Sequence, residues 1–369
     1  MHSVIRKAQG ISYPLVRENG EAFHSRHSAI VAHETRENPK PPSAYSCNLA
    51  YGSGAFVKIV SQLRDPDVIV REKALSVVGG MAVDQVKVVQ LVTSDILVAL
   101  VDCCLDPIEK IRMLAVQAVI SLLANENCIV RFVDVSQKLR PLLTDEMAEV
   151  RYRFSHLLLR FAETNQGQEA LLQQSYIKLL IDRYRLEDGL TQEKILRVLS
   201  ILVKTPAGTK DALSSGIMAC LLPVVLEPSV RLQRQAIQCL ATMCEHTEAK
   251  QAAIEHKLVP ILTASLHGEL AIEAACLLMN MSVEITAKEE IVRQATILQH
   301  ISNILEPSSN SSLVLRRYAL QLTTNITECS KGRELFSNPH LVNLVTLCLS
   351  DPSVAHIADR CLAQIRFKP

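Results

Sequence analysis

One pattern of apolar and polar positions recurs along the chain about every 40 residues. In each unit a leucine ends an apolar stretch, a short break rich in acidic residues, proline or glycine follows, and a new amphipathic stretch begins. The break leucines are Leu63, Leu105, Leu143, Leu186, Leu226, Leu266, Leu305 and Leu349. Their successive spacings are 42, 38, 43, 40, 40, 39 and 44 residues. A period of this length is typical of arrays of stacked helices, so the pattern predicts eight repeat units in residues 51–369.

The breaks contain the residues that end one helix and start the next. Proline cannot continue the preceding helix but suits the first turn of the following one, and aspartate accepts hydrogen bonds from the free N–H groups at a helix start. Leu63-Arg-Asp-Pro and Leu349-Ser-Asp-Pro carry both residue types. We therefore expect a helix to begin after each break.

Two further positions keep a common register behind each break. The first is alanine in six of the eight units, as expected where one helix closely approaches its neighbour in the stack. Its residues are Ala74, Ala115, Phe154, Ile195, Ala236, Ala274, Ala319 and Ala358. The second position lies six residues later, at Gly80, Ser121, Arg160, Ile201, Thr242, Asn280, Asn325 and Gln364.

In two of the last units this register places an asparagine six residues after an alanine, at Ala274/Asn280 and Ala319/Asn325. The spacing resembles the armadillo family, whose third helices carry an asparagine at this place on their concave face. The resemblance implies an all-α, right-handed superhelical solenoid of about eight armadillo/HEAT-like repeats. An asparagine amide both donates and accepts hydrogen bonds, so it can hold the backbone of an extended peptide. The protein-binding residues implied are Ser121, Arg160, Thr242, Asn280, Asn325 and Gln364.

The first four units also carry an acidic residue six positions before a basic one. The pairs are Asp65/Arg71, Asp106/Arg112, Asp145/Arg151 and Asp188/Lys194. They resemble the aspartate–arginine ladder of HEAT repeats, which ties the turn of one repeat to the helix of the next. We expect the pairs to set the register of the stack and to contribute about 0 to 1 kcal/mol each.

Composition agrees with a stack of short aliphatic helices. Hydrophobic residues make up 48% of the 369 residues, aromatic residues only 4%, and tryptophan is absent. The 39 basic and 38 acidic residues nearly cancel, which argues against nucleic acid as a partner. The eleven cysteines lie mostly within aliphatic stretches and are interpreted as reduced core thiols of a cytoplasmic protein.

The ends of the chain and its longest apolar runs add two expectations. Residues 1–50 lack the repeat and contain Pro39, Pro41 and Pro42, so we expect an extended or disordered N-terminal tail. No run approaches 18 uncharged apolar residues, so we expect no membrane partner.

Motifs that carry chemistry are weak. Gly52-Ser-Gly54 lacks the rest of a phosphate-binding loop, and Ser175-Tyr-Ile-Lys178 lacks the companion motifs of Ser-x-x-Lys enzymes. One further cluster contains cysteines and histidines that could in principle bind zinc. The chain has no Cys-x-x-Cys pair, so we interpret these side chains as part of the helical packing and not as zinc ligands. That cluster is Cys239, Cys244, His246 and His256. We expect no catalysis, no cofactor, no metal and no small-molecule substrate.

A stretch rich in arginine and tyrosine is a candidate docking patch, because these residues often anchor protein interfaces. It comprises Arg151, Tyr152, Arg153, Arg183, Tyr184 and Arg185. The alternative interpretation is an ordinary charged outer face of solenoid helices. Arg160 is the best single candidate, because it also occupies the second register position.

The residues at the register positions differ from those of two well-known classes of armadillo protein. Nuclear-import receptors use paired tryptophans and asparagines, but this chain has no tryptophan. Cell-adhesion armadillo proteins line their groove with lysine and arginine, whereas the register positions here are mostly neutral. The sequence resembles more closely the armadillo-repeat proteins of the ciliary radial spoke, in Ala55–Asp67, in Leu258–Leu266 and in the ending Ile365-Arg-Phe-Lys-Pro369.

This resemblance spans residue 50 to the end and implies a structural component of the axonemal radial spoke that supports motility. Its location would be the cytoskeleton of a cilium or flagellum. Its partners would be other radial-spoke proteins, with the microtubule doublet as a further candidate. The alternative is a cytosolic adaptor or transport receptor that binds an extended peptide along its concave groove.

Overall fold

The computed structural model describes residues 54–82, 84–93 and 95–367. These residues form 22 α-helices, three short 3-10 helices and no strand, which confirms the all-α prediction. Residues Phe56–Pro369 form one compact unit. The expected tail at residues 1–50 lies outside the described residues, so the division into tail and solenoid stays a prediction.

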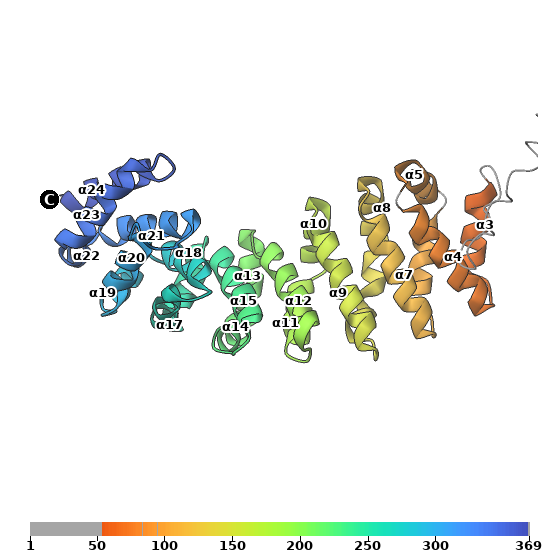
Figure 1. Cartoon of the computed structure of the whole chain (residues 1–369). Coiled ribbons are helices and arrows are strands. Elements are labelled where there is room, and N and C mark those ends of the chain that lie inside the picture. The colour runs from red at the N-terminus through yellow and green to blue at the C-terminus, as the bar shows by residue number, and fades with distance from the viewer. Residues whose placement is uncertain (1–53, 83, 94, 368–369) are drawn as a thin grey trace, which may run out of the picture. The chain divides into compact units, whose positions relative to one another are not determined.

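The helices fall into eight units, and the longest helix of each unit follows the break. We call these the third helices. They are α4 (Val68–Met81), α7 (Glu109–Leu122), α9 (Ala148–Ala162), α12 (Gly189–Leu202), α15 (Val230–Met243), α18 (Ala271–Met281), α21 (Leu313–Ile326) and α24 (Ala355–Arg366). Each third helix contacts the next along the chain, so together they form one continuous layer (Figure 1). This layer carries the candidate site.

Two rows of shorter helices complete the units. The second helices precede the breaks and are α3 (Gly54–Leu63), α6 (Ile96–Cys104), η1 (Gln137–Thr144), α11 (Tyr176–Tyr184), α14 (Ile217–Val225), α17 (Leu258–Ala264), α20 (Ile297–Leu305) and α23 (Pro339–Leu347). The first helices are α5 (Gln85–Thr93), α8 (Glu126–Ser136), α10 (Asn165–Gln173), α13 (Pro206–Ser214), α16 (Thr247–Glu255), α19 (Ile285–Val292) and α22 (Ser330–Phe336). The 3-10 turns η2 (Ser265–His267) and η3 (Cys348–Ser350) extend α17 and α23.

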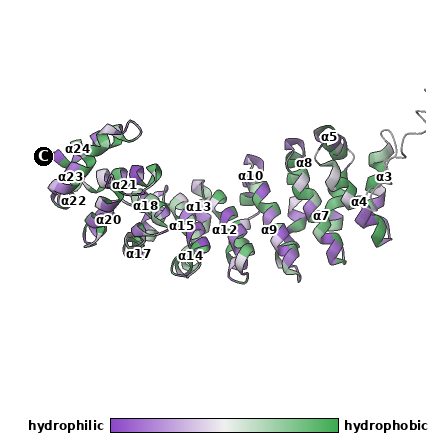
Figure 2. Ribbon diagram, viewed as in Figure 1, coloured by the Kyte–Doolittle hydropathy of each residue, from purple (hydrophilic) through white to green (hydrophobic). Residues whose placement is uncertain are grey.

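The hydrophobic core lies between these rows. Hydrophobic and hydrophilic residues alternate along the helices, as amphipathic helices require (Figure 2). All eight residues of the first register position are at most 1% exposed. Six of them are alanine, whose small side chain lets neighbouring third helices approach closely.

The breaks lie between the second and third helices. Two of their prolines lie before the third helix and not in its first turn, where we expected them. Asp65 accepts a hydrogen bond from the backbone N–H of Asp67, and Asp106 accepts one from Ile108, each at 2.8 Å. Pro66 and Pro107 are the middle residues of these two turns. They therefore precede the helix instead of forming its first turn, because the aspartate turn occupies that position.

An acid–base ladder is present in the first units, but its ion pairs differ from the predicted ones, because each arginine pairs with the aspartate of the next break and not with the aspartate six residues before it. Arg71 forms an ion pair with Asp106, and Arg112 forms one with Asp145, each in the following unit. The same arginines donate to backbone carbonyls of their own break, Arg71 to Asp65 at 2.8 Å and Arg112 to Asp106 at 3.0 Å. Each arginine thus ties its helix to two turns, which sets the spacing between units.

The ladder ends differently from the prediction. Arg151 pairs with Glu187, whose side chain is only 2% exposed, and not with Asp188. Asp188 is instead the residue that precedes the first turn of α12. Among the described residues, no ion pair joins Asp188 to Lys194, so the predicted pairing within one unit is absent here as well.

Candidate protein-binding site

The predicted register residues lie at the same turn of successive third helices, near the C-terminal end of each. Five of them are half-exposed and Arg160 is exposed. The five are Ser121, Thr242, Asn280, Asn325 and Gln364. The structure therefore places all six on the surface of the third-helix layer, while their role in binding stays a prediction.

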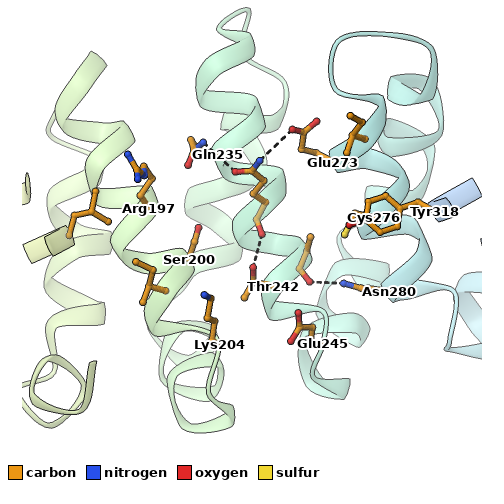
Figure 3. Close-up of a pocket in the computed structure, with 15 residues that line it drawn as sticks. Arg197, Ser200, Lys204, Gln235, Thr242, Glu245, Glu273, Cys276, Asn280 and Tyr318 are labelled. Carbon is orange, nitrogen blue, oxygen red and sulfur yellow. Dashed lines mark hydrogen bonds between the residues drawn. The ribbon is translucent and has the colours of Figure 1, made fainter. Parts of the chain in front are cut away.

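A hollow with a volume of about 460 Å³ crosses this layer, and we call it the third-helix groove. Thr242 of α15 and Asn280 of α18 line it, so the structure brings two of the six candidates into one site (Figure 3). The other four lie outside its lining. Its lining runs from Leu159 of α9 through Arg197 of α12 to Tyr318 of α21, so the groove extends over several units.

Both asparagines are bonded to the preceding unit. The side-chain amide of Asn280 donates to the carbonyl of Ala241 at 2.9 Å (Figure 3). The amide of Asn325 donates to the carbonyl of Met279 at 3.2 Å and to Ser282 Oγ at 3.0 Å. These amides hold neighbouring units together, and an extended peptide would bind through the hydrogen-bonding capacity that remains.

The hydroxyl groups of the row are bonded within their own helices. Thr242 Oγ1 donates to the carbonyl of Gln238 at 3.0 Å, and Ser121 Oγ donates to that of Gln117 at 3.1 Å. A hydroxyl that donates in this way keeps its lone pairs as acceptors. Thr242 can therefore accept a hydrogen bond from a peptide N–H in the groove.

Charge changes sign across the groove. Arg197 and Lys204 line the side formed by α12 and its following turn, whereas Glu245 and Glu273 line the side formed by α15 and α18. Glu273 is bound by Arg234 at 3.1 Å. The cationic side at α12 therefore complements acidic groups of a partner segment, whereas the carboxylate of Glu273 already has a cationic partner.

The cationic side continues onto α9. Partial burial and the neighbouring charges of Lys194 and Arg160 hold the pKa of His156 below its ordinary value. Folding therefore favours the neutral form of this imidazole. Arg160 itself pairs with Glu163 at 2.7 Å in an exposed contact.

The arginine- and tyrosine-rich stretch does not form one exposed patch. Arg151 and Arg183 both pair with Glu187, and Tyr184 is only 4% exposed. The two arginines hold the buried carboxylate of Glu187, which requires cationic partners, and Tyr184 belongs to the core. A docking role stays a prediction for the remaining three, which are Tyr152, Arg153 and Arg185.

The weak chemical motifs are built into the helical packing. Burial raises the pKa of the Cys239 thiol and of the Cys244 thiol to about 12 each. His246 Nε2 lies 3.2 Å from the carbonyl oxygen of Lys204. Within the described residues, no three metal-ligating side chains converge. No helix among the described segments is both long and apolar enough to span a bilayer.

The sequence also held a signal for groove residues that we had not predicted. Arg197, Gln238 and Cys276 lie four residues before register positions, which is one helical turn away on the same face. A search at this spacing would have found them. Tyr318 has no such signal, because it reaches the groove from the next unit.

Comparison with solved structures shows where this fold has been seen. An engineered protein determined by the Northeast Structural Genomics Consortium matches with a TM-score of 0.76 and 19% identity, over 86% of this chain and 79% of that one. A designed armadillo repeat protein in complex with the peptide (KR)4 matches with a TM-score of 0.57 and 18% identity, over 61% of this chain and 99% of that one.

A third match is with computationally designed armadillo repeat proteins for modular peptide recognition, at a TM-score of 0.56 and 19% identity, over 61% of this chain and 99% of that one. No protein-family model matches the chain. At these identities the likeness establishes the fold, which is the helical solenoid of armadillo repeats.

Proposed function

We propose that this chain is a non-catalytic scaffold that holds other proteins through its third-helix layer. The observation that carries the proposal is the third-helix groove, in which side chains from successive units line one hollow of about 460 Å³. An extended polypeptide matches such a site, because it presents backbone and side-chain groups at regular intervals to a regular row of helices. A designed protein with this fold was solved with a peptide bound, which supports a polypeptide ligand.

A charge reversal at Arg160 tests the scaffold proposal. Arg160→Glu is expected to weaken partner binding without lowering the melting temperature, because its ion pair with Glu163 is exposed. Lys178→Glu on α11 is the matched control, since it makes the same charge change at an exposed position in the second-helix row. Equal partner binding by the two variants would contradict the proposal, and a lower melting temperature for Arg160→Glu would make Arg160 structural.

For the cellular setting we propose the radial spoke of the ciliary or flagellar axoneme, where the scaffold would support motility. The proposal rests on the resemblance carried by residues 55–67, 258–266 and 365–369. Its partners would be other spoke proteins, with the microtubule doublet as a further candidate. A tagged copy in a ciliated cell should remain along the axoneme after detergent and salt extraction.

A second candidate function is a cytosolic adaptor or transport receptor for an extended peptide. The observation that favours it is the open groove at Thr242 and Asn280, which suits reversible binding. A diffuse pool that detergent and salt remove would support this function and contradict the axonemal one.

A further inference from the structure

The second helix of the third unit differs in type from those of its neighbours. There η1 is a 3-10 helix with Pro141 inside it, whereas the corresponding elements α6 and α11 of the neighbouring units are α-helices. Between η1 and α11 lies a cleft with a volume of about 560 Å³, which we call the second-helix cleft. It shares no lining residue with the third-helix groove, so it is a separate surface.

The walls of this cleft are apolar. Pro141 and Leu143 line it from η1, and Leu179 and Leu186 line it from α11 and the turn that follows. Leu186 is a break leucine with 73% of its surface exposed, whereas Leu143 at the same position one unit earlier is 5% exposed. Covering Leu186 and its apolar surroundings with another apolar group would release water from this surface, which favours binding.

The rim of the cleft carries excess positive charge. Lys138 and Arg140 line it from η1, are exposed, and take part in none of the ion pairs formed between described residues. Arg183 also lines the cleft and shares the single carboxylate of Glu187 with Arg151. Asp182 is the acidic group of the lining and lies on the α11 side. An occupant that matches this rim is therefore apolar at its centre and acidic where it meets η1.

We propose that the second-helix cleft is a second docking site, for a protein segment that carries leucine-type side chains flanked by acidic residues. Exposed Pro141 and Leu186 leave the occupant partly in solvent, which suits a segment of a larger partner better than a small molecule that a site must enclose. Since the two sites are separate, one copy of the chain holds two proteins at once.

The test uses the full chain and short fluorescein-labelled peptides, with binding followed by fluorescence anisotropy. The first peptide contains leucine and glutamate, the second has lysine in place of glutamate, and the third has serine in place of leucine. We expect the leucine/glutamate peptide to bind most tightly. Arg140→Glu should weaken it about tenfold, as expected for the loss of one charge-assisted hydrogen bond, and should improve the lysine peptide.

Matched variants show whether the peptide binds in the second-helix cleft or elsewhere on the chain. Leu186→Ser should weaken binding, whereas Leu226→Ser, at the exposed break position of the next unit and outside the cleft, should not. Lys178→Glu on α11 and Arg160→Glu in the third-helix layer should bind the peptide as the unsubstituted chain does. The proposal is overturned if Arg140→Glu and Leu186→Ser leave the affinity unchanged, if the serine peptide binds equally well, or if decanoate binds more tightly than the leucine/glutamate peptide.

Discussion

At the scale of single residues, each register asparagine bonds to a residue of the preceding unit, about 40 positions earlier in the sequence. Asn280 donates to a carbonyl 39 residues earlier, and Asn325 donates to one 46 residues earlier. The spacing of the sequence predicted that both would reach the surface of the third-helix layer. It could not predict these bonds, because their acceptors are backbone carbonyls that no residue type marks.

Asn280→Ala should lower the free energy of unfolding by about 1 kcal/mol, because it removes a hydrogen bond between two units. Ser121→Ala is the control, since its hydroxyl bonds only within its own helix, and it should change stability by less than about 0.5 kcal/mol. Urea unfolding of both variants measures the difference. Equal effects would show that the amide of Asn280 adds nothing between the units.

His156 gives a prediction about pH. Its pKa lies below 6.5 because of partial burial and the charge of Lys194, so folding favours its neutral form. The stability that it contributes is therefore present above pH 6.5 and is lost as the pH falls through the folded-state pKa. Lys194→Gln should raise this pKa, as followed by NMR titration of the ring protons, with His156→Gln to assign the signal. A pKa of 6.5 or more in the unsubstituted protein would contradict the account.

At the scale of elements, the corner between a third helix and the next first helix has a recurring design. In three units the side chain that precedes the first helix accepts a hydrogen bond from a glycine N–H three residues later, as Thr205 does from Gly208 at 3.0 Å. A Cβ at Gly208 would lie 2.0 Å from the carbonyl oxygen of Leu202. The glycines at this corner are Gly167, Gly208 and Gly332.

Gly208→Ala should therefore destabilise the protein by about 2 kcal/mol, because the methyl group meets backbone that cannot turn away. Gly80→Ala is the matched control. Gly80 lies within α4 with nothing within 4 Å of its Cβ position, and the alanine should stabilise the helix by about 0.5 to 1 kcal/mol. Thermal and urea unfolding of the two variants would have to shift in opposite directions.

A buried ion pair of the ladder should contribute more to stability than an exposed ion pair. Arg112→Ala leaves Asp145, whose side chain is only 8% exposed, without its two hydrogen bonds from the guanidinium, so it should cost about 2 to 3 kcal/mol. This exceeds the contribution expected from the sequence, because the pair is buried more deeply than a surface pair. Arg160→Ala removes an exposed pair and should cost less than about 1 kcal/mol. If denaturant unfolding shows equal losses, the ladder does not set the register of the units.

The starts of third helices were predictable where an aspartate turn marks the break, as at Asp65, Asp106 and Asp145. The 3-10 form of η1 was not predicted, although Pro141 lies inside it. The turns before the second helices were also missed. Asp95, Ser175 and Lys257 adopt positive φ there, between 55° and 58°, where glycine would have been the recognisable residue.

At the scale of the whole molecule, the repeat predicted the fold because each unit packs mainly against its neighbours. The candidate site was only partly predictable. Its row of register residues follows from spacing within one helix, but the groove combines side chains from residue 159 to residue 318. No local pattern links these positions, so which units would form a hollow depended on side chains that meet only in the folded stack.

The most direct test of the central claim is site-specific photo-crosslinking in a ciliated cell. A photoreactive side chain at Thr242 lies in the third-helix groove, and one at exposed Lys210 on α13 serves as the control. The account predicts a covalent adduct with another protein from position 242, retained in the axoneme after extraction, and none from position 210. No adduct from position 242, or equal adducts from both positions, would contradict a scaffold that binds its partners through the third-helix layer.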